Sequence, residues 1–298
     1  MRAEACFSDR HRSEIQVMVE ALIEAADAVD DLYRRVAAST YVKSDGSPVT
    51  DADLAADQII RSRMSVAFPD DALLTEEGID DKRRLQTERC WIVDPIDGTQ
   101  QFVDRTGDFD CLIALVEHGS PILAGSIQPT TGTLCIAVRG EGAFSGPADA
   151  LRRVQYQDRE EGVPLITTSV WFGAPENLPY LGEIAQGAGA ETVDYRQIGF
   201  TPRLFLDPRP CDAILGFRIG DDQFMAYDWD FAVGDLFIHE AGGRLTDLAG
   251  RRLKYNQEDP RVDAGVVAAV AHPLHEQLLR LCQAKLACNA IRPDLTRI

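Results

Sequence analysis

Residues 91–99 read Trp91-Ile92-Val93-Asp94-Pro95-Ile96-Asp97-Gly98-Thr99 and are the most informative feature of this chain. The three opening apolar residues of this stretch predict a buried strand that leads directly into two aspartates. Buried carboxylates without partners are strongly destabilising, so this strand end needs a cation, and hard oxygen ligands favour Mg²⁺. The Gly-Thr pair can then open a helix whose first backbone N–H groups bind an anion. A divalent metal beside an anion site indicates phosphate-ester chemistry.

The composition excludes several classes of partner. The chain has 298 residues, with 48 acidic against 30 basic side chains and a net charge of −18. A surface this acidic argues against binding to a nucleic-acid polymer or an anionic membrane. It would also repel an anionic small-molecule substrate, so local metal ions and helix N-termini have to overcome that field.

Cysteine usage and hydropathy predict a cytoplasmic protein. The seven cysteines are widely spaced and include no Cys-x-x-Cys pair, which favours reduced thiols. The N-terminal twelve residues lack the apolar segment of a secretory signal. The longest weakly polar run, 264–271, is too short to span a bilayer.

Periodicity predicts a mixed α/β fold in two parts. Helical spacing predicts a long helix over 13–38 that begins with a capping box at Ser13, and a second helix from about 51 that ends before Pro69. Predicted strands and helices follow at 72–74, 91–93, 111–116, 122–127, 134–138, 165–168, 179–186, 213–217 and 230–241. The three strands over 111–138 indicate an antiparallel meander. The polar stretch 140–158 predicts a boundary between an N-terminal α+β domain, 1–150, and a C-terminal α/β domain, 151–298.

Acidic residues at the ends of these elements form the main candidate site. The set is Asp53, Glu76, Glu77, Asp94, Asp97 and Asp230. Taken singly, each also fits a helix cap or a solvated charge. The Asp94–Asp97 pair is different, because an apolar strand and a rigid proline deliver both carboxylates to one place.

Four motifs together resemble the inositol monophosphatase superfamily of Mg²⁺-dependent, lithium-sensitive phosphatases. They are Pro48-Val49-Thr50-Asp51-Ala52-Asp53, Glu76-Glu77, the Asp94–Thr99 signature, and Trp229-Asp230 with Glu240-Ala241-Gly242-Gly243. The resemblance covers roughly residues 43–243. It implies an alternating α-β-α-β-α sandwich, a homodimer and the hydrolysis of small soluble phosphate esters.

The resemblance also implies a ligand set for two to three Mg²⁺ ions per site. Asp94 would bridge two ions. The remaining ligands would be Glu76 and the Ile96 carbonyl at the first ion, Asp97 and Asp230 at the second, and Asp53, largely through water, at a third.

Further roles carried over by the resemblance concern the phosphate and the water. The backbone N–H groups of Gly98 and Thr99 would hold the phosphate, and Asp53, Glu76 and Thr99 would be the catalytic residues, with Thr99 oriented by Asp53 to help activate the water. One position departs from the family pattern Thr-x-Asn-Phe, because Gln101 replaces the asparagine. The longer amide puts a hydrogen bond typical of the family in doubt but leaves the ligands untouched.

The substrate is less clearly marked. Residues 102–123 and 253–256 look most like the bacterial 3'(2'),5'-bisphosphate nucleotidases, and Arg203, near Ile198-Gly199, stands where those enzymes carry a basic residue for a second phosphate. Asp94-Pro95-Ile96 and the Glu240 motif are equally typical of inositol monophosphatases. The balance leans weakly to a nucleotide such as 3'-phosphoadenosine 5'-phosphate. Inositol 1-phosphate or another sugar or polyol phosphate is the alternative, and histidinol phosphate and fructose bisphosphate stay open.

Two other classes of protein compete with an enzyme. A non-catalytic protein that binds metal or a phosphometabolite would explain the Gln101 departure. A structural subunit would use its acidic surface only for solubility, and Mg²⁺ would not stabilise it.

Overall fold

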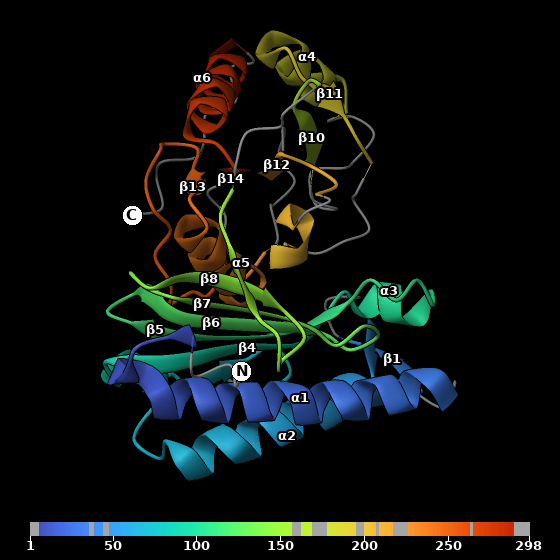
Figure 1. The fold of residues 1–298 in the computed structure, drawn as a ribbon, viewed down its shortest axis with the longest axis vertical. Coiled ribbons are helices and arrows are strands. Elements are labelled where there is room, and N and C mark those ends of the chain that lie inside the picture. Colours follow the sequence, from blue (N-terminus) through green and yellow to red (C-terminus); the bar gives the residue numbers. More distant parts are fainter. Residues whose placement is uncertain are drawn as a thin grey trace.

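The computed structural model describes residues 6–35, 39–43, 48–156, 162–168, 178–194, 200–206, 209–216, 226–262 and 265–288. Within these ranges, helices and sheets alternate in five layers, α-β-α-β-α, from the α1–α2 pair at the bottom of Figure 1 to the α4–α6 pair at its top. This arrangement confirms the layered α/β sandwich that the sequence predicted.

The lower sheet has seven strands in the order β3-β4-β5-β6-β7-β8-β9. Their bounds are Ala72–Thr75, Arg89–Asp97, Asp110–Glu117, Ser120–Gln128, Thr133–Val138, Gly142–Gly146 and Arg152–Val154. The predicted meander is confirmed, since β5, β6 and β7 pair antiparallel in sequence order. In this sheet only β3 pairs parallel with its neighbour, β4; Glu76 follows the end of β3, and Asp94 and Asp97 lie in the last four residues of β4.

Two helices, α1 (Arg12–Arg35) and α2 (Asp51–Ala67), cover the outer face of this sheet. A Cβ on Gly125 of β6 would lie 2.7 Å from Cε of Met18, so the glycine lets α1 approach closely. The capping box expected at Ser13 is wrong. The helix continues from a 3-10 turn, η2 (Asp9–His11), and Ser13 lies inside it with its hydroxyl donating to Glu14.

The opposite face of the sheet packs on α5 (Asp228–Glu240), which is the central layer (Figure 1). A Cβ on Gly234 would lie 2.5 Å from Phe200, so this glycine admits the aromatic ring. The upper sheet lies beyond α5, in the order β11-β10-β12-β14-β13. Its elements are β10 Leu165–Thr168, β11 Glu191–Thr192, β12 Ala213–Gly216, β13 Arg244–Asp247 and β14 Val266–Ala269, covered by α4 Leu178–Ala188 and α6 His272–Cys288.

The structure continues across the predicted boundary at 150. Strand β9 lies beyond that residue and still pairs with β8, and α5 packs against the lower sheet. The division into 1–150 and 151–298 therefore stays a prediction about folding units.

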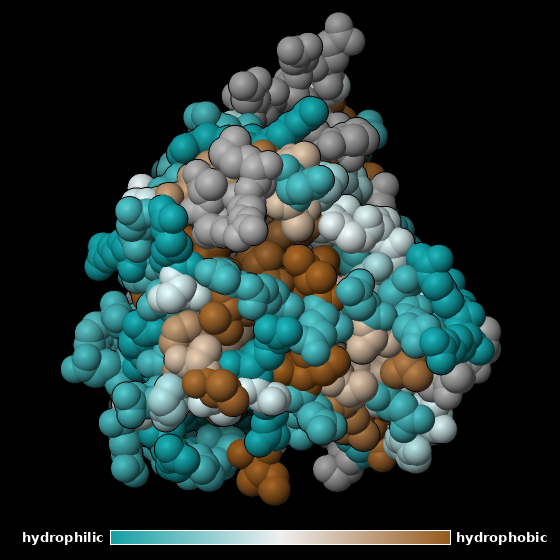
Figure 2. Space-filling model, turned by 60° about the horizontal axis from the view of Figure 1, so that its bottom comes forward, coloured by the Kyte–Doolittle hydropathy of each residue, from teal (hydrophilic) through white to brown (hydrophobic). Residues whose placement is uncertain are grey.

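The visible surface is mostly hydrophilic. On the face shown in Figure 2, teal residues dominate and the hydrophobic ones form several groups between them. In the described ranges, no helix is long and apolar enough to cross a membrane.

Candidate metal centre

Strand β4 brings Asp94 and Asp97 to one point through an irregularity in its pairing. Side chains of a regular strand alternate between faces, so residues three apart would point in opposite directions. The register between β4 and β5 shifts between Asp94 and Asp97, around Pro95, which cannot donate to the ladder. The local bulge explains how one strand end presents both carboxylates to the same site.

Helix α5 adds the third carboxylate. Asp230 is its third residue, and Oδ2 accepts a hydrogen bond of 2.6 Å from the backbone N–H of Tyr227. One carboxylate oxygen each from Asp94, Asp97 and Asp230 lies within 4.8 Å of the others. Among the described residues, this is the only group of three such side chains that converges in this way.

The state of these oxygens fits a divalent cation. Asp94 Oδ1 and Asp97 Oδ2 are buried and have no hydrogen-bond partner in the described ranges. Burial, followed by the charges of neighbouring carboxylates, raises the pKa of both groups well above the ordinary value. Burial raises the pKa of Asp230 to about 7. Clustered hard oxygens of this kind favour Mg²⁺. A metal bound there would polarise a phosphate ester and lower the pKa of a coordinated water.

Glu76 joins this group from the end of β3. Its backbone N–H donates to the carbonyl of Val93 over 3.1 Å, which fixes it beside Asp94. Its charge contributes to the raised pKa of Asp94, after burial. Glu76 is therefore placed to complete the carboxylate set that the sequence predicted.

Lys43 forms ion pairs with Glu76 and Glu77. Nothing in the sequence predicted a lysine at this place. Its ammonium lies 2.6 Å from Oε1 of Glu76 and 2.5 Å from Oε1 of Glu77. Burial alone would lower the pKa of Lys43, but the two carboxylates raise it above its ordinary value. Burial also raises the pKa of Glu77 to about 7. Lys43 offsets part of the negative charge of the site.

Asp53 and Thr99 meet at the edge of the carboxylate group. Asp53 closes a capping box on α2, because its Oδ2 accepts hydrogen bonds from the N–H and the hydroxyl of Thr50, at 2.8 and 2.5 Å. Its Oδ1 accepts a hydrogen bond of 2.9 Å from the Thr99 hydroxyl. The same hydroxyl lies 3.2 Å from the carbonyl oxygen of Ile96, so Asp53, Thr99 and Ile96 form one connected unit.

Gly98 makes the turn between β4 and the short helix α3 (Thr99–Val103). Its φ is +100°, and a Cβ there would lie 3.1 Å from the Asp108 carbonyl and 3.2 Å from Oε1 of Gln101. Only glycine suits this turn without strain. The side-chain amide of Gln101 thus packs directly over the turn.

Arg203 is not an unpaired cation, because its guanidinium is bound to Asp110. It lies in the 3-10 turn η4 (Pro202–Phe205), and its Nε and Nη2 donate to Asp110 at 2.9 and 2.6 Å. Asp110 is fully buried and pairs in register with Asp97 across β4 and β5. Nη1 of Arg203 lies 3.8 Å from Oδ1 of Asp108. Its predicted neighbours Ile198 and Gly199 lie outside the described residues.

Glu240, the first residue of its motif, joins two elements of the fold. Its carboxylate accepts the backbone N–H groups of Gly140 and Gly142 at 2.9 and 3.0 Å. This contact fastens the end of α5 to the β7–β8 hairpin.

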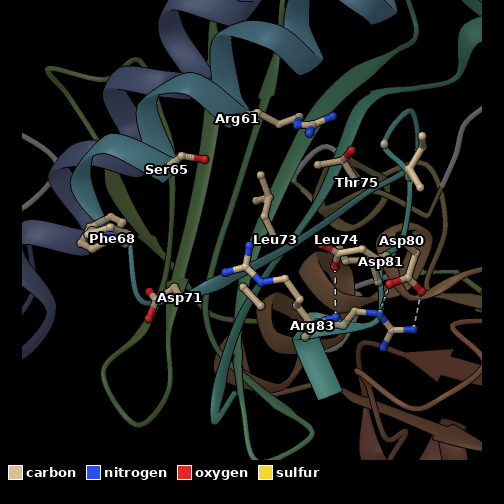
Figure 3. A pocket seen from close by; sticks show the side chains of 15 residues that line it. Arg61, Ser65, Phe68, Asp71, Leu73, Leu74, Thr75, Asp80, Asp81 and Arg83 are labelled. Carbon is tan, nitrogen blue, oxygen red and sulfur yellow. Dashed lines mark hydrogen bonds and ion pairs between the residues drawn. The ribbon is translucent and has the colours of Figure 1, made fainter. Parts of the chain in front are cut away.

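A cavity of about 290 Å³ lies on the other side of β3 from β4, between α2 and the loop after Glu77 (Figure 3). Arg61, Arg83 and Thr75 are among the residues that line it. None of Asp94, Asp97 and Asp230 does. The chemistry therefore belongs to the carboxylate group and not to this cavity.

Sequence reasoning missed Lys43 and Asp110 as parts of the site. Lys43 follows an exposed three-residue strand, β1 (Thr40–Val42), which pairs with β2 (Pro48–Thr50), and nothing local marks its partners. The single acidic residue at the start of an apolar strand was the only signal for Asp110.

Comparison with known proteins agrees with the family that the sequence motifs resemble. Residues 11–180, more than half of the chain, match the sequence pattern of the inositol monophosphatase family. The chain belongs to the inositol monophosphatase family.

Three proteins are examples of those to which this chain is similar. The 3'(2'),5'-bisphosphate nucleotidase CysQ of Escherichia coli (strain K12) is 30% identical over 243 residues, covering 81% of this chain and 93% of the relative. The histidinol-phosphatase of Chlorobaculum parvum is 37% identical over 241 residues, covering 80% and 87%. The crystal structure of extragenic suppressor protein suhB from Bartonella henselae has a TM-score of 0.72 at 25% identity, covering 90% and 97%.

Membership of the inositol monophosphatase family makes this chain a metal-dependent phosphatase that hydrolyses phosphate monoesters. The predictions of a phosphoric monoester hydrolase and of its family are confirmed. The readings as a non-catalytic binding protein or a structural subunit lose their support.

Proposed function

We propose that this inositol monophosphatase family member hydrolyses 3'(2'),5'-bisphosphate nucleotides with two to three Mg²⁺ ions. The convergence of Asp94, Asp97 and Asp230, with buried oxygens that lack partners, carries the metal site. Glu76 and the Ile96 carbonyl would complete the set at the first ion. Asp94 would be the shared ligand, as the resemblance to the family implies.

The remaining site residues take the roles that their contacts allow. Asp53 lies beside the group and would support a third ion, largely through water. Thr99, bonded to Asp53, helps to activate the attacking water, which makes Asp53, Glu76 and Thr99 the catalytic residues. The backbone N–H groups of Gly98 and Thr99 hold the phosphate.

The nucleotide substrate is supported by the length of the similarity to CysQ, which covers most of both chains. In this proposal, Nη1 of Arg203 receives the second phosphate, since its other edge is held by Asp110. Phosphate release from 3'-phosphoadenosine 5'-phosphate, compared with inositol 1-phosphate at saturating Mg²⁺, tests it. A preference for the inositol ester would reject the nucleotide and keep the metal site.

One observation favours a substrate with a single phosphate as the second candidate. Asp110 offsets the charge of Arg203, and Asp108 stands 3.8 Å from its remaining edge, so a second phosphate would meet two carboxylates. A sugar, polyol or histidinol phosphate avoids that repulsion. Histidinol phosphate therefore belongs in the same assay, also because a histidinol-phosphatase is the 37% identical relative.

We also propose that the enzyme is a lithium-sensitive cytoplasmic homodimer. The described surface exposes large hydrophobic side chains that a second subunit could cover, at Tyr41, Val42, Leu54, Val66, Ile79, Leu85 and Val163. Light scattering of the purified protein tests the dimer, and a monomer at assay concentration would contradict it. Loss of phosphate release on addition of Li⁺, with Na⁺ as the control, tests the lithium sensitivity.

A further inference from the structure

Arg84 is a buried arginine whose every N–H group has a partner. Its side chain is 1% exposed. Nε and Nη2 donate to the two oxygens of Asp80 at 3.0 and 2.9 Å. Nη1 donates to Oδ1 of Asn256 and the carbonyl of Gln257 at 2.9 and 2.6 Å, and Nη2 also to the carbonyl of Glu258 at 3.2 Å. A lysine offers only three donors from one point and cannot replace this fork.

Three of these partners, Asn256, Gln257 and Glu258, lie in the segment 256–261, which follows β13 in the chain and contacts the start of α5; we name this segment the strap. The backbone N–H of Asn256 donates to Oδ2 of Asp228 at 2.7 Å, and the N–H of Asp228 donates to the carbonyl of Pro260 at 2.8 Å. Asp228 is the first residue of α5, and Asp230 is the third. The strap is therefore hydrogen-bonded to the helical turn that carries Asp230, a predicted metal ligand.

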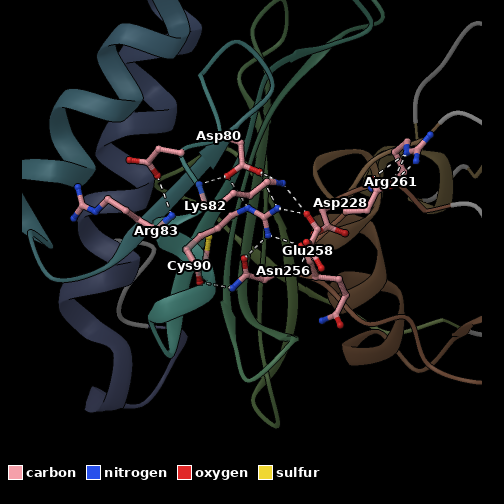
Figure 4. Close-up of polar contacts among 12 residues, drawn as sticks. Asp80, Lys82, Arg83, Cys90, Asp228, Asn256, Glu258 and Arg261 are labelled. Carbon is pink, nitrogen blue, oxygen red and sulfur yellow. Dashed lines mark hydrogen bonds and ion pairs between the residues drawn. The ribbon is translucent and has the colours of Figure 1, made fainter. Parts of the chain in front are cut away.

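The other end of the network is the loop that begins with Glu76. Asp80 lies four residues beyond Glu76, and the ammonium of Lys82 donates to the strap carbonyl of Glu258 at 2.7 Å. Figure 4 shows Asp80 and Lys82 from this loop facing Asn256 and Glu258 from the strap. The network thus joins the two parts of the chain that supply Glu76 and Asp230.

The contacts between the strap and the loop of Glu76 bear on the position of the first turn of α5, which carries Asp230. Asp94, Asp97 and Asp230 repel one another while no cation lies between them, and Glu76 adds to that repulsion. Packing on the lower sheet fixes the axis of α5, but its first turn lies at the end of the helix. The contacts of the strap join this turn to the loop that begins with Glu76.

We propose that Arg84 and Asn256 are positioning residues for the metal centre, which hold Asp230 in place relative to Glu76 on the other side of the proposed site. This inference rests on the proposed metal ligands. Residues behind metal ligands typically change metal affinity by about 10- to 100-fold when they are replaced.

The test is calorimetric titration of substrate-free protein with Mg²⁺, together with thermal unfolding with and without Mg²⁺. Arg84→Lys and Asn256→Ala are compared with Arg83→Lys, since Arg83 is the adjacent, exposed arginine that lines the cavity of Figure 3. We expect about tenfold weaker Mg²⁺ binding in the first two variants, with a smaller rise in Tm on adding Mg²⁺, and wild-type behaviour in the control.

A purely structural role would lower Tm with and without Mg²⁺ by the same amount and leave the affinity unchanged, and that result overturns the proposal. If Arg84→Lys does not fold, Asn256→Ala decides, because it removes one hydrogen-bonding side chain and no charge. If the wild-type protein itself binds no Mg²⁺, the proposed metal centre fails and this inference with it. If the wild-type protein binds Mg²⁺ and the variants bind it with the same affinity, this inference is rejected and the proposed metal centre is kept.

Discussion

The hydroxyl of Thr99 donates a 2.9 Å hydrogen bond to Oδ1 of Asp53, which joins two residues 46 positions apart in the chain. Asp53 is fully buried, and burial raises its pKa above the ordinary value. Its other oxygen is taken by Thr50. The bond orients the Thr99 hydroxyl next to the carboxylate group rather than toward solvent.

We expect Thr99→Val to reduce kcat by about a hundredfold or more, because general acid–base groups contribute in this range. Valine keeps the shape of the side chain and removes only its hydroxyl. The variant should bind Mg²⁺ normally in a calorimetric titration. Thr99→Ser is the control and should retain most of the activity; equal loss in both variants would point to packing instead of the hydroxyl.

Replacing Asp94 by asparagine tests the shared ligand. We expect phosphate release to fall at least about a hundredfold and Mg²⁺ binding to weaken strongly, since a charged oxygen donor is lost. The metal-free variant should unfold at a temperature no lower than the wild type, because one of several mutually repelling buried carboxylates is gone. Asp27→Asn, on the exposed face of α1, is the matched control, and near-normal turnover in Asp94→Asn would reject the assignment.

The affinity for Mg²⁺ should rise with pH up to neutrality. Burial and the charge of Glu76 raise the pKa of Asp230 from 3.8 to about 7, so the metal-free folded protein holds a proton that the unfolded chain has lost between those values. Its stability therefore falls as the pH rises through this window, while Mg²⁺ binding, which needs the ionised form, strengthens. Titrations in buffers of different ionisation enthalpy measure the released protons. An affinity that is constant from pH 5 to 8 would contradict this.

Arg203 and Asp110 should behave as a coupled buried pair. Arg203→Met leaves Asp110 buried without its partner, and breaking such a pair costs about 3–5 kcal/mol. In the double variant Arg203→Met, Asp110→Asn, the free energy of unfolding measured in urea should return most of the way to the wild-type value. If the losses of the two single variants simply add in the double variant, the prediction is wrong. If Arg203 also binds a second phosphate, the double variant should raise KM for 3'-phosphoadenosine 5'-phosphate but not for inositol 1-phosphate.

The sequence predicted those parts of the site that depend on a few neighbouring residues. The apolar approach to Asp94, the proline after it and the helical pattern after Asp230 are all legible within a few residues, and the layered fold followed from the motifs. The bulge that turns Asp94 and Asp97 to one side depends on the pairing with β5, which no local pattern shows.

Long-range partners account for the rest. Whether Lys43 reaches Glu76, or Arg84 reaches the strap, depends on how loops from distant parts of the chain pack together. The expected cap at Ser13 failed for a related reason, because the preceding turn extends the helix past it. Charge composition likewise could not show that Asp110 occupies the fork of Arg203.

The most direct test of the account is the release of inorganic phosphate from 3'-phosphoadenosine 5'-phosphate, measured on one preparation before chelation, after chelation and after Mg²⁺ is restored. We predict release that stops on chelation and returns with Mg²⁺, at a rate above that for inositol 1-phosphate and histidinol phosphate. Release that survives chelation, or no release from any of the three esters at saturating Mg²⁺, would contradict the account.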